Sequence, residues 1–301
     1  MSEPASWLLR PRPATALALV RITTGLYAVG IVLGRLPSQP DLARAEITWA
    51  PMGVWRFAAS APPPSLIVAV GVVAIAAGVA VVAGWRHRVT GPLCLVGTLA
   101  VTTLASSWGH LFHSDNLVVL HLAVVAVAPA ADAWSLDQRA GRATDRGPAD
   151  VYGWAVRVAA LITVVTYVLA GLAKVRLGGW QWLDGDTLRG LVAHDNLRKD
   201  LIGAPSTPLA GPVVRQAWIF PPFALATLVV ELGAPLALLG RRAAVAWCAA
   251  AWLFHVGIVA LMAVAFIYPL TGLAFVPTLA ATGVLPLERR RRPAPTIAVP
   301  A

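Results

Sequence analysis

Lys174 is the residue whose type and position could do acid–base chemistry in this sequence. Of the 24 basic residues only Lys174 and Lys199 are lysines, and the others are arginines. Lys174 lies in the segment YVLAGLAKVRLGGWQWLDGD (167–186), after a long apolar run. A lysine at such a helix end usually extends its ammonium group to the membrane interface. An amine can also lose its proton when it leaves water, whereas a guanidinium cannot. The use of lysine therefore favours a base here.

Four further ionisable residues, Arg21, His121, Glu231 and His255, lie inside apolar runs. Such a side chain is costly within a membrane unless it is paired or faces a cavity. Glu231 and His255 each lie about twelve residues into their runs, roughly 18 Å deep at 1.5 Å per residue. We expect a pair between Glu231 and either His255 or Arg21. All four are predicted to give the bundle internal polar support, and His255 could also relay protons.

His113 belongs to a separate polar group, together with His110 and Asp115. His110 and His113 would be one helical turn apart, which is a spacing found in metal sites. No cysteine or further acidic residue joins them in the sequence, and Asp115 also fits the N-terminal cap of a helix. We therefore predict no metal site and expect His113 to lie at the same membrane face as Lys174.

The composition indicates a membrane protein. Of the 301 residues 58% are hydrophobic and 13% are charged, with a mean hydropathy of +0.71, whereas a soluble domain has about 25% charged residues. The net charge of +10 comes from short arginine clusters between apolar runs. That pattern is typical of membrane loops and argues against nucleic-acid binding. Cys94 and Cys248 lie within apolar runs and form no metal or redox motif.

The predicted fold is an all-α, multi-span membrane bundle of about eight transmembrane helices. A span needs about 20 apolar residues, and the Tyr268–Pro269 step leaves seven spans with a broken last helix as an alternative. The basic loops place both termini in the cytoplasm and Lys174 at the outer face. We predict one bundle domain over 1–288 and a disordered basic tail over 289–301. The predicted spans are 15–34, 65–84, 89–107, 115–131, 154–174, 219–239, 243–267 and 269–286.

Several motifs occur in the order found in one membrane-protein family. The chain resembles the horizontally transferred transmembrane (HTTM) domain, the membrane part of vitamin K-dependent gamma-carboxylases and of their bacterial relatives. The stretch around Lys174 is similar to the family's Tyr-x-x-Ala-Gly-x-x-Lys signature, and the resemblance covers most of the chain. The matching segments are Leu19–Gly25, His113–Ser114, Trp134–Asp137, Tyr167–Lys174 with Trp180, Glu231–Pro235, and Phe254–His255 with Met262 and Phe266.

The resemblance implies a chemistry. In the carboxylases the lysine that matches Lys174 is taken as the base that deprotonates a reduced quinone. The histidine that matches His113 is linked to the same active site, and we expect it to hydrogen-bond Lys174. Tyr167 and Trp180 are expected to contact the quinone. The implied cofactor is a reduced quinone, menaquinone or vitamin K hydroquinone, with O2 and CO2 as co-substrates.

The predicted function is a quinol-dependent enzyme of the vitamin K carboxylase/epoxidase type in the plasma membrane. The carboxylases have a double lysine where this chain has Ala173 and Lys174, and a folded outer domain that we do not expect after residue 288. These departures are compatible with quinol chemistry and count against carboxylation of a protein glutamate. The expected partners are membrane lipid and quinone, with a peptide or protein substrate or a separate chain that supplies an outer domain.

Two other functions fit the same sequence. A non-enzymatic membrane protein that binds lipid or peptide, or that assists maturation of a partner, would need only a positive charge at Lys174. A transporter would be expected to have repeated halves and paired broken helices. The sequence has no evident repeat, and the interruption at Pro269 is its only transporter-like feature.

Overall fold

The structure is a computed structural model that describes residues 7–44 and 49–285. Within these ranges every regular element is a helix. The one isolated β-bridge in the described part of the chain joins Arg12 to Ala149. Residues 289–301, the predicted disordered tail, lie outside the described residues.

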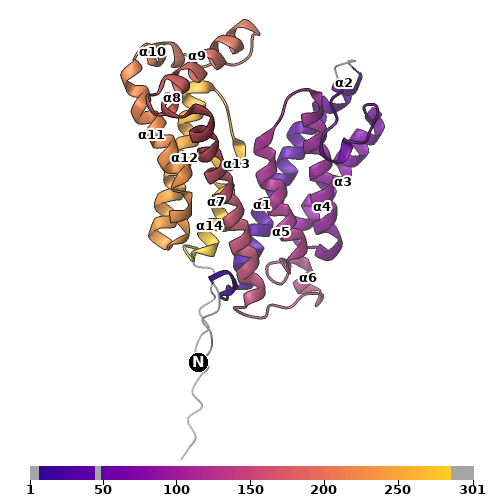
Figure 1. Cartoon of the computed structure of the whole chain (residues 1–301). Coiled ribbons are helices and arrows are strands. Elements are labelled where there is room, and N and C mark those ends of the chain that lie inside the picture. The colour runs from indigo at the N-terminus through magenta and orange to yellow at the C-terminus, as the bar shows by residue number, and fades with distance from the viewer. Residues whose placement is uncertain (1–6, 45–48, 286–301) are drawn as a thin grey trace, which may run out of the picture.

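The first half of the chain forms a bundle of four apolar helices, coloured indigo to magenta in Figure 1. Small residues let these helices approach closely: a Cβ atom added at Gly97 of α4 would lie 2.8 Å from the Cβ of Ala74 on α3. The main helices are α1 (Ala14–Arg35), α3 (Pro64–Ala83), α4 (His87–Ala105) and α5 (Asn116–Val127). The connections contain η1 (Trp7–Leu9), η2 (Leu36–Ser38), α2 (Gln39–Arg44), η3 (Gly53–Trp55), η4 (Ser106–Trp108), η5 (His113–Asp115) and α6 (Leu136–Arg139).

The second half contains the longest helix of the described chain and a group of shorter ones. Its main helices are α7 (Asp150–Gly178), α11 (Phe220–Leu232) and α12 (Arg241–Met262). After α12 the chain leaves helical geometry at 263–266, and Ala263 has a left-handed backbone with φ +49°. The remaining elements are α8 (Trp180–Leu183), α9 (Asp186–Leu201), α10 (Ala210–Val214), η6 (Ala217–Ile219), η7 (Ala234–Leu238), α13 (Ile267–Leu270), η8 (Leu273–Phe275) and α14 (Val276–Ala281).

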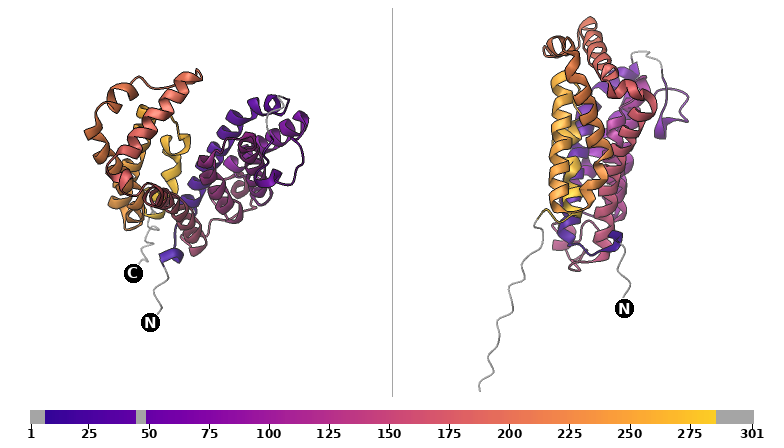
Figure 2. Two further views of the ribbon diagram at one scale, coloured as in Figure 1. Left: turned by 45° about the horizontal axis from the view of Figure 1, so that its top comes forward. Right: turned by 60° about the vertical axis from the view of Figure 1, so that its left-hand side comes forward.

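Helix α7 is shared by the two halves. It contacts α1 and α5 of the first half, and α11 and α14 of the second. Toward one end the halves diverge, which gives the V shape visible in Figure 1 and, from a second direction, in the left panel of Figure 2. The connections with α2 and with α8–α10 lie at this open end. Both ends of the described chain lie at the opposite, closed end.

The prediction of an all-helical membrane bundle is confirmed. Five helices have the length and hydropathy of a span, and the shorter apolar helices His113–Val127 and Ala217–Leu232 cover the first parts of the predicted fourth and sixth spans. The predicted eighth span, 269–286, is not one helix, because α13, η8 and α14 divide it. The main break lies at 263–266, before the Tyr268–Pro269 step. The number of crossings and the cytoplasmic side of both termini stay predictions.

His121 is a buried polar link between the two halves. Its Nδ1 is 2.9 Å from the hydroxyl oxygen of Tyr268 on α13, and its Nε2 is 3.1 Å from the hydroxyl oxygen of Thr163 on α7. The side chain has no exposed surface. A hydrogen-bonded imidazole avoids the cost of an unpaired polar group in an apolar interior. The predicted supporting role of His121 therefore has a specific form, which is to tie α5 to α7 and α13.

The predicted alternative in which Arg21 pairs with Glu231 is wrong. The Arg21 side chain is fully buried in the first half and lies against the turn that follows α5. Its five N–H donors suit a group of backbone oxygens that no helix satisfies. The guanidinium nitrogens donate to the carbonyl oxygens of Ala130 (2.8 Å), Ala133 (3.3 Å), Trp134 (2.6 Å) and Val82 (3.4 Å).

Asp137 joins the connection after α5 to the connection between α3 and α4. Its carboxylate accepts hydrogen bonds from the backbone N–H groups of Arg86 (2.9 Å) and His87 (2.8 Å) and from Nε of Arg142 (2.8 Å). Burial alone would raise the pKa of Asp137. The two backbone hydrogen bonds and Arg142 outweigh burial, and the pKa is lowered. The charged carboxylate thus stabilises the first turn of α4.

Asp137→Asn should lower the free energy of unfolding by about 2 kcal/mol, since an amide replaces a charged acceptor of three hydrogen bonds. Because the folded-state pKa is below the ordinary value of 3.8, this stabilisation is present above pH ~4 and is lost as the pH falls through the folded-state pKa. Unfolding in detergent at several pH values would measure both effects. The exposed Asp145 gives the control, Asp145→Asn. An equal loss in both variants would contradict the role of Asp137.

Candidate functional site

Lys174 and Glu231 form a partly buried ion pair between α7 and α11. The Lys174 ammonium donates to Oε1 of Glu231, and their side chains are 23% and 3% exposed. The close approach of the helices depends on Gly171, where an added Cβ would lie 2.8 Å from Cδ2 of Leu232. Because Gly171 precedes Lys174 by one helical turn, the Ala-Gly-x-x-Lys spacing sets the lysine against α11. The glycine is therefore what lets this lysine meet this glutamate.

Tyr167 and His255 continue the same polar group. Tyr167 lies two turns before Lys174 and hence on the same face of α7. Its hydroxyl is 2.7 Å from Nε2 of His255 on α12. We call Tyr167, Lys174, Glu231 and His255 the Lys174 cluster. The predicted Glu231–His255 pair is wrong among the described residues, because Tyr167 takes His255 and Lys174 takes Glu231.

Two polar atoms of the Lys174 cluster are buried without a hydrogen-bond partner among the described residues. They are Oε2 of Glu231 and Nδ1 of His255, whose side chains belong to residues 2% and 7% exposed. Leaving such an atom unsatisfied costs about 1–3 kcal/mol. Native structures keep few such atoms, and they often mark a functional site. Both atoms therefore remain available as hydrogen-bonding groups within the cluster.

An apolar cavity of about 610 Å³ adjoins the cluster. We call it the Lys174 cavity. Its volume falls within the range of about 300–1,000 Å³ that small-molecule sites have. Helices α9, α11 and α12 and the 263–266 segment supply its walls, and the Lys174 ammonium lies 5.3 Å from the ring centre of Trp182. Lining residues include Lys174, Trp182, Leu191, Phe223, Phe254 and Gly257.

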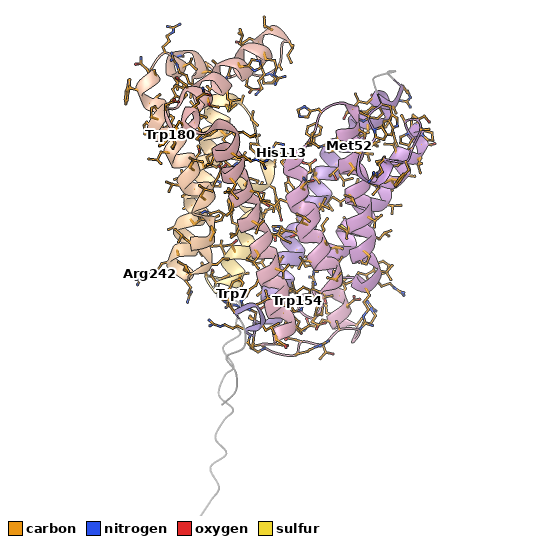
Figure 3. The ribbon with its side chains drawn as sticks, in the orientation of Figure 1. Trp7, Met52, His113, Trp154, Trp180 and Arg242 are labelled. Atoms are coloured by element: carbon orange, nitrogen blue, oxygen red, sulfur yellow. The ribbon has the colours of Figure 1, made fainter. Side chains whose placement is uncertain are left out.

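A second cavity, of about 910 Å³, lies between the two halves at the open end. We call it the Arg35 cavity, after a lining residue of α1. His113 lines it, and Figure 3 shows His113 at the opening between the halves. No hydrogen bond joins His113 to Lys174 in the described chain, so the predicted contact between them is wrong. Whether His113 takes part in chemistry stays a prediction.

Phe266 is the partition between the two cavities. Its ring centre lies 5.9 Å from that of His113 on one side and 5.3 Å from that of His255 on the other. Phe266 and its neighbour Val264 line both cavities. The non-helical 263–266 segment thus lies where irregular backbone is tolerated in a membrane protein, against other parts of the protein and along a cavity.

The second lysine has a structural role in supporting this segment. Lys199 of α9 donates to the carbonyl oxygen of Met262, at the end of α12. Asn196 and Thr207 donate to the carbonyl oxygens of Leu261 and Ala260, each at 2.8 Å. The last carbonyls of a helix have no partner within it, so these three side chains complete α12. Sequence reasoning did not identify Lys199, Asn196 or Thr207, whose only signal is their polarity after an apolar signature.

Trp180 and Trp182 are placed differently from the expectation. Trp180 is 82% exposed, lines neither cavity, and projects from the outer side of the second half in Figure 3. Trp182 is buried, lies beside Lys174, and donates from Nε1 to the carbonyl oxygen of Ala224 on α11. Two positions on a short helix point in nearly opposite directions, which explains why only the second tryptophan reaches the cavity.

The described residues include no group of three or more His, Cys, Asp or Glu side chains that could hold a metal ion. His110 instead packs its ring against Phe112 at 4.4 Å, while Asp115 pairs with Arg35 at 3.2 Å. His110 therefore has an aromatic partner and Asp115 a cationic one.

Lys174→Met should destabilise the fold by about 3 kcal/mol or more, because it leaves the buried Glu231 carboxylate without its partner. The double variant Lys174→Met/Glu231→Leu should recover most of this loss. A double-mutant cycle on unfolding in detergent measures the coupling. The exposed pair Asp41–Arg44, with side chains 80% and 62% exposed, is the matched control and should couple by less than about 1 kcal/mol. Equal coupling in the two cycles would contradict a buried pair.

Comparison with known proteins identifies the family. The model of the HTTM domain matches residues 9–282, a region that includes both halves, the Lys174 cluster and both cavities. A search of curated proteins and a search of solved structures give no match. The HTTM family is associated with vitamin K-related membrane proteins. The resemblance drawn from the motifs is confirmed, and the chain belongs to the HTTM domain family.

Proposed function

We propose that the protein is a quinol-dependent membrane enzyme of the vitamin K carboxylase/epoxidase type, with Lys174 as the base. The observation that supports this most directly is the Lys174–Glu231 pair beside an apolar cavity. A lysine that served only as an interfacial anchor would extend to water. Here the amine instead turns into the bundle, against a carboxylate that is 3% exposed.

The residues around the cavity fit a reduced quinone. The walls are mainly apolar, as an aromatic ring system requires, and polar groups are gathered at one place, as needed to orient hydroxyls. Among the residues of the Lys174 cluster, Lys174 lines the cavity, and Glu231 lies behind it with a buried, unsatisfied Oε2. Trp182 offers an aromatic face beside the amine. When bound, a reduced quinone would supply two electrons and two acidic hydroxyl protons for chemistry with O2 and CO2.

Glu231 gives the lysine a way to act as a base. A lysine must be neutral to accept a proton, and a charged amine cannot do so. In the pair, one proton can move from Nζ of Lys174 to Oε1 of Glu231, which yields a neutral amine and a neutral carboxylic acid with no change in total charge. A low-dielectric surrounding reduces the advantage of the ionic form over this neutral form. Lys174 would then accept a hydroxyl proton from the bound molecule at Nζ.

The Tyr167–His255 hydrogen bond adds a second proton-carrying unit to the cluster. His255 keeps Nδ1 without a partner, so the imidazole can exchange a proton at one nitrogen while the other holds Tyr167. We assign His255 and Tyr167 to the passage of protons away from Lys174. We assign His113 to the far side of Phe266, where it faces the Arg35 cavity. Carboxylation of a protein glutamate is not included in the proposal.

The membrane location of this reaction is part of the proposal. We place the protein in the plasma membrane, and the charge distribution of the loops favours an outward orientation of the Lys174 end. A peptide or protein substrate, or a separate chain with an outer domain, would approach from that end. The main alternative is a non-enzymatic HTTM protein that binds lipid or peptide or assists maturation. The apolar Lys174 cavity would serve such a protein as well, and Lys174 would then contribute only its charge.

Lys174→Arg separates the two functions. As a base, Lys174 cannot be replaced by arginine, so Lys174→Arg and Lys174→Ala should each lower turnover by about 100-fold or more. The assay follows quinone oxidation by the reconstituted protein with reduced vitamin K or menaquinone, O2 and labelled bicarbonate. Arg176→Ala, an exposed change two residues away, is the control and should retain activity. Turnover of Lys174→Arg equal to that of the unaltered protein would exclude the base.

Gly257→Leu tests whether the Lys174 cavity holds the quinone. Gly257 lines this cavity, and no described atom lies within 4 Å of a Cβ added there, so leucine should fill the cavity without disturbing the protein. We expect loss of menaquinone from protein reconstituted with it and then purified, as measured by extraction and mass spectrometry. Gly190→Leu is the control, since Gly190 faces open space and lines neither cavity. Retention by Gly257→Leu would place the quinone elsewhere.

A further inference from the structure

The Arg35 cavity has a wall whose shape the protein's own packing does not explain. Its α1 side carries Leu26, Gly30 and Gly34, one helical turn apart, and the wall ends at Arg35. A Cβ atom added at Gly30 or Gly34 would meet no described atom within 4 Å. At Gly25 of the same helix an added Cβ would lie 3.0 Å from Cγ2 of Val82. Gly25 is thus needed for helix packing, and Gly30 and Gly34 are not.

Glycine within a helix is unfavourable relative to alanine, because the unfolded chain has more conformational freedom to lose. Gly30 and Gly34 destabilise α1 relative to alanine, and no close helix packing among the described residues requires a glycine at either position. A glycine pair at this spacing often receives a partner helix. On this face, however, α9 and the 263–267 segment of the same chain stand across the cavity. The space that the two glycines keep open therefore suits a thin, flexible molecule that enters between the halves.

The mouth of the Arg35 cavity is cationic. Three cations, Arg35, Arg198 and Lys199, line it against two carboxylates, Asp115 and Asp195, which leaves one excess positive charge. Asp115 pairs with Arg35 at 3.2 Å, and Asp195 pairs with both Arg198 (3.0 Å) and Lys199 (2.7 Å). Asp195 is therefore shared by two cations, and the side chain of Arg198 remains 51% exposed.

The apolar and charged parts of the cavity are separated along one axis. From Leu26 to Arg35 the α1 wall rises nine residues, about 13 Å at 1.5 Å per residue. Its apolar part lies toward the middle of the bundle, and its charged part lies at the open end with α9 (Figure 1). A phospholipid has the same order of parts, with acyl chains toward the membrane centre and a phosphate at the surface.

We propose that the Arg35 cavity binds an anionic phospholipid. One acyl chain lies along Leu26, Gly30 and Gly34, and the phosphate lies at Arg198 and Arg35. The excess positive charge favours a lipid with net negative charge over a zwitterionic one. The second chain remains in the bilayer between the halves. This binding does not depend on quinol chemistry, because the Lys174 cavity lies on the other side of Phe266.

The test measures lipid retention by the full chain. The protein is reconstituted in nanodiscs that contain equal amounts of phosphatidylglycerol and phosphatidylcholine, released, and examined by native mass spectrometry. We expect a bound phosphatidylglycerol on the unaltered protein and little phosphatidylcholine. Gly34→Leu should abolish this adduct, while Gly190→Leu, which also adds a leucine into open space, should keep it. Arg198→Gln should weaken retention about five-fold, as expected for one cation near a lipid phosphate, while Arg176→Gln should have no effect.

Several results would overturn the proposal: equal retention of the two lipids, an adduct that persists in Gly34→Leu, or equal losses in the target and control variants. A self-associated chain that Gly34→Leu dissociates would show that the glycines bind a second copy instead. Menaquinone retention, measured on the same variants after reconstitution with added menaquinone, separates this site from the quinone site. Gly34→Leu should leave menaquinone bound and Gly257→Leu should leave phosphatidylglycerol bound, so either site can fail while the other stands.

Discussion

A polar group inside a membrane must find its partner within the protein. The hydrogen bonds and ion pair that meet this requirement hold the helices of both halves in position. Arg21 binds the carbonyl oxygens left free after α5 ends, and Lys199 does the same at the end of α12. His121 ties the halves together, and Lys174 neutralises Glu231. Apolar side chains surround these links, and such side chains can often be replaced by others of similar volume. The few polar links fix the position of one helix against another.

The helices could be predicted from sequence because the signal is simple. Long apolar runs, bounded by arginines and prolines, correspond to α1, α3, α4, α7 and α12. The predictions were weaker where a segment is apolar without being regular. Residues 263–285 read as the end of one span and most of a further span, yet the chain there is broken by the non-helical 263–266 segment and short helices. Hydropathy measures the solvent around a segment, and the side chains of Lys199, Asn196 and Thr207 that bind the last carbonyls of α12 come from a distant part of the sequence.

The members of the Lys174 cluster were singled out from the sequence, and their partners were not. Lys174, Glu231 and His255 were selected by type and position and Tyr167 by the family resemblance, and the structure brings them into one cluster. Depth along a span does not specify which face of a helix a residue occupies, so Glu231 was paired with His255 or Arg21 when its partner is Lys174. A residue of α7 at the span's end meets α11 because Gly171 brings the backbones together. Trp182 was missed for a related reason, since a two-residue offset decides which tryptophan faces inward.

Phe266 separates an apolar cavity beside a lysine from a larger one with a cationic mouth, and it belongs to both. A rotation of its ring that enlarges one space must reduce the other, and Phe266 ends the non-helical 263–266 segment, where its carbonyl oxygen accepts a hydrogen bond from the N–H of Leu270. Two occupants that favour different ring positions would be thermodynamically linked, each altering the affinity of the other by the same factor. Phe266 would then separate two bound molecules and also make the affinity for each depend on whether the other is bound.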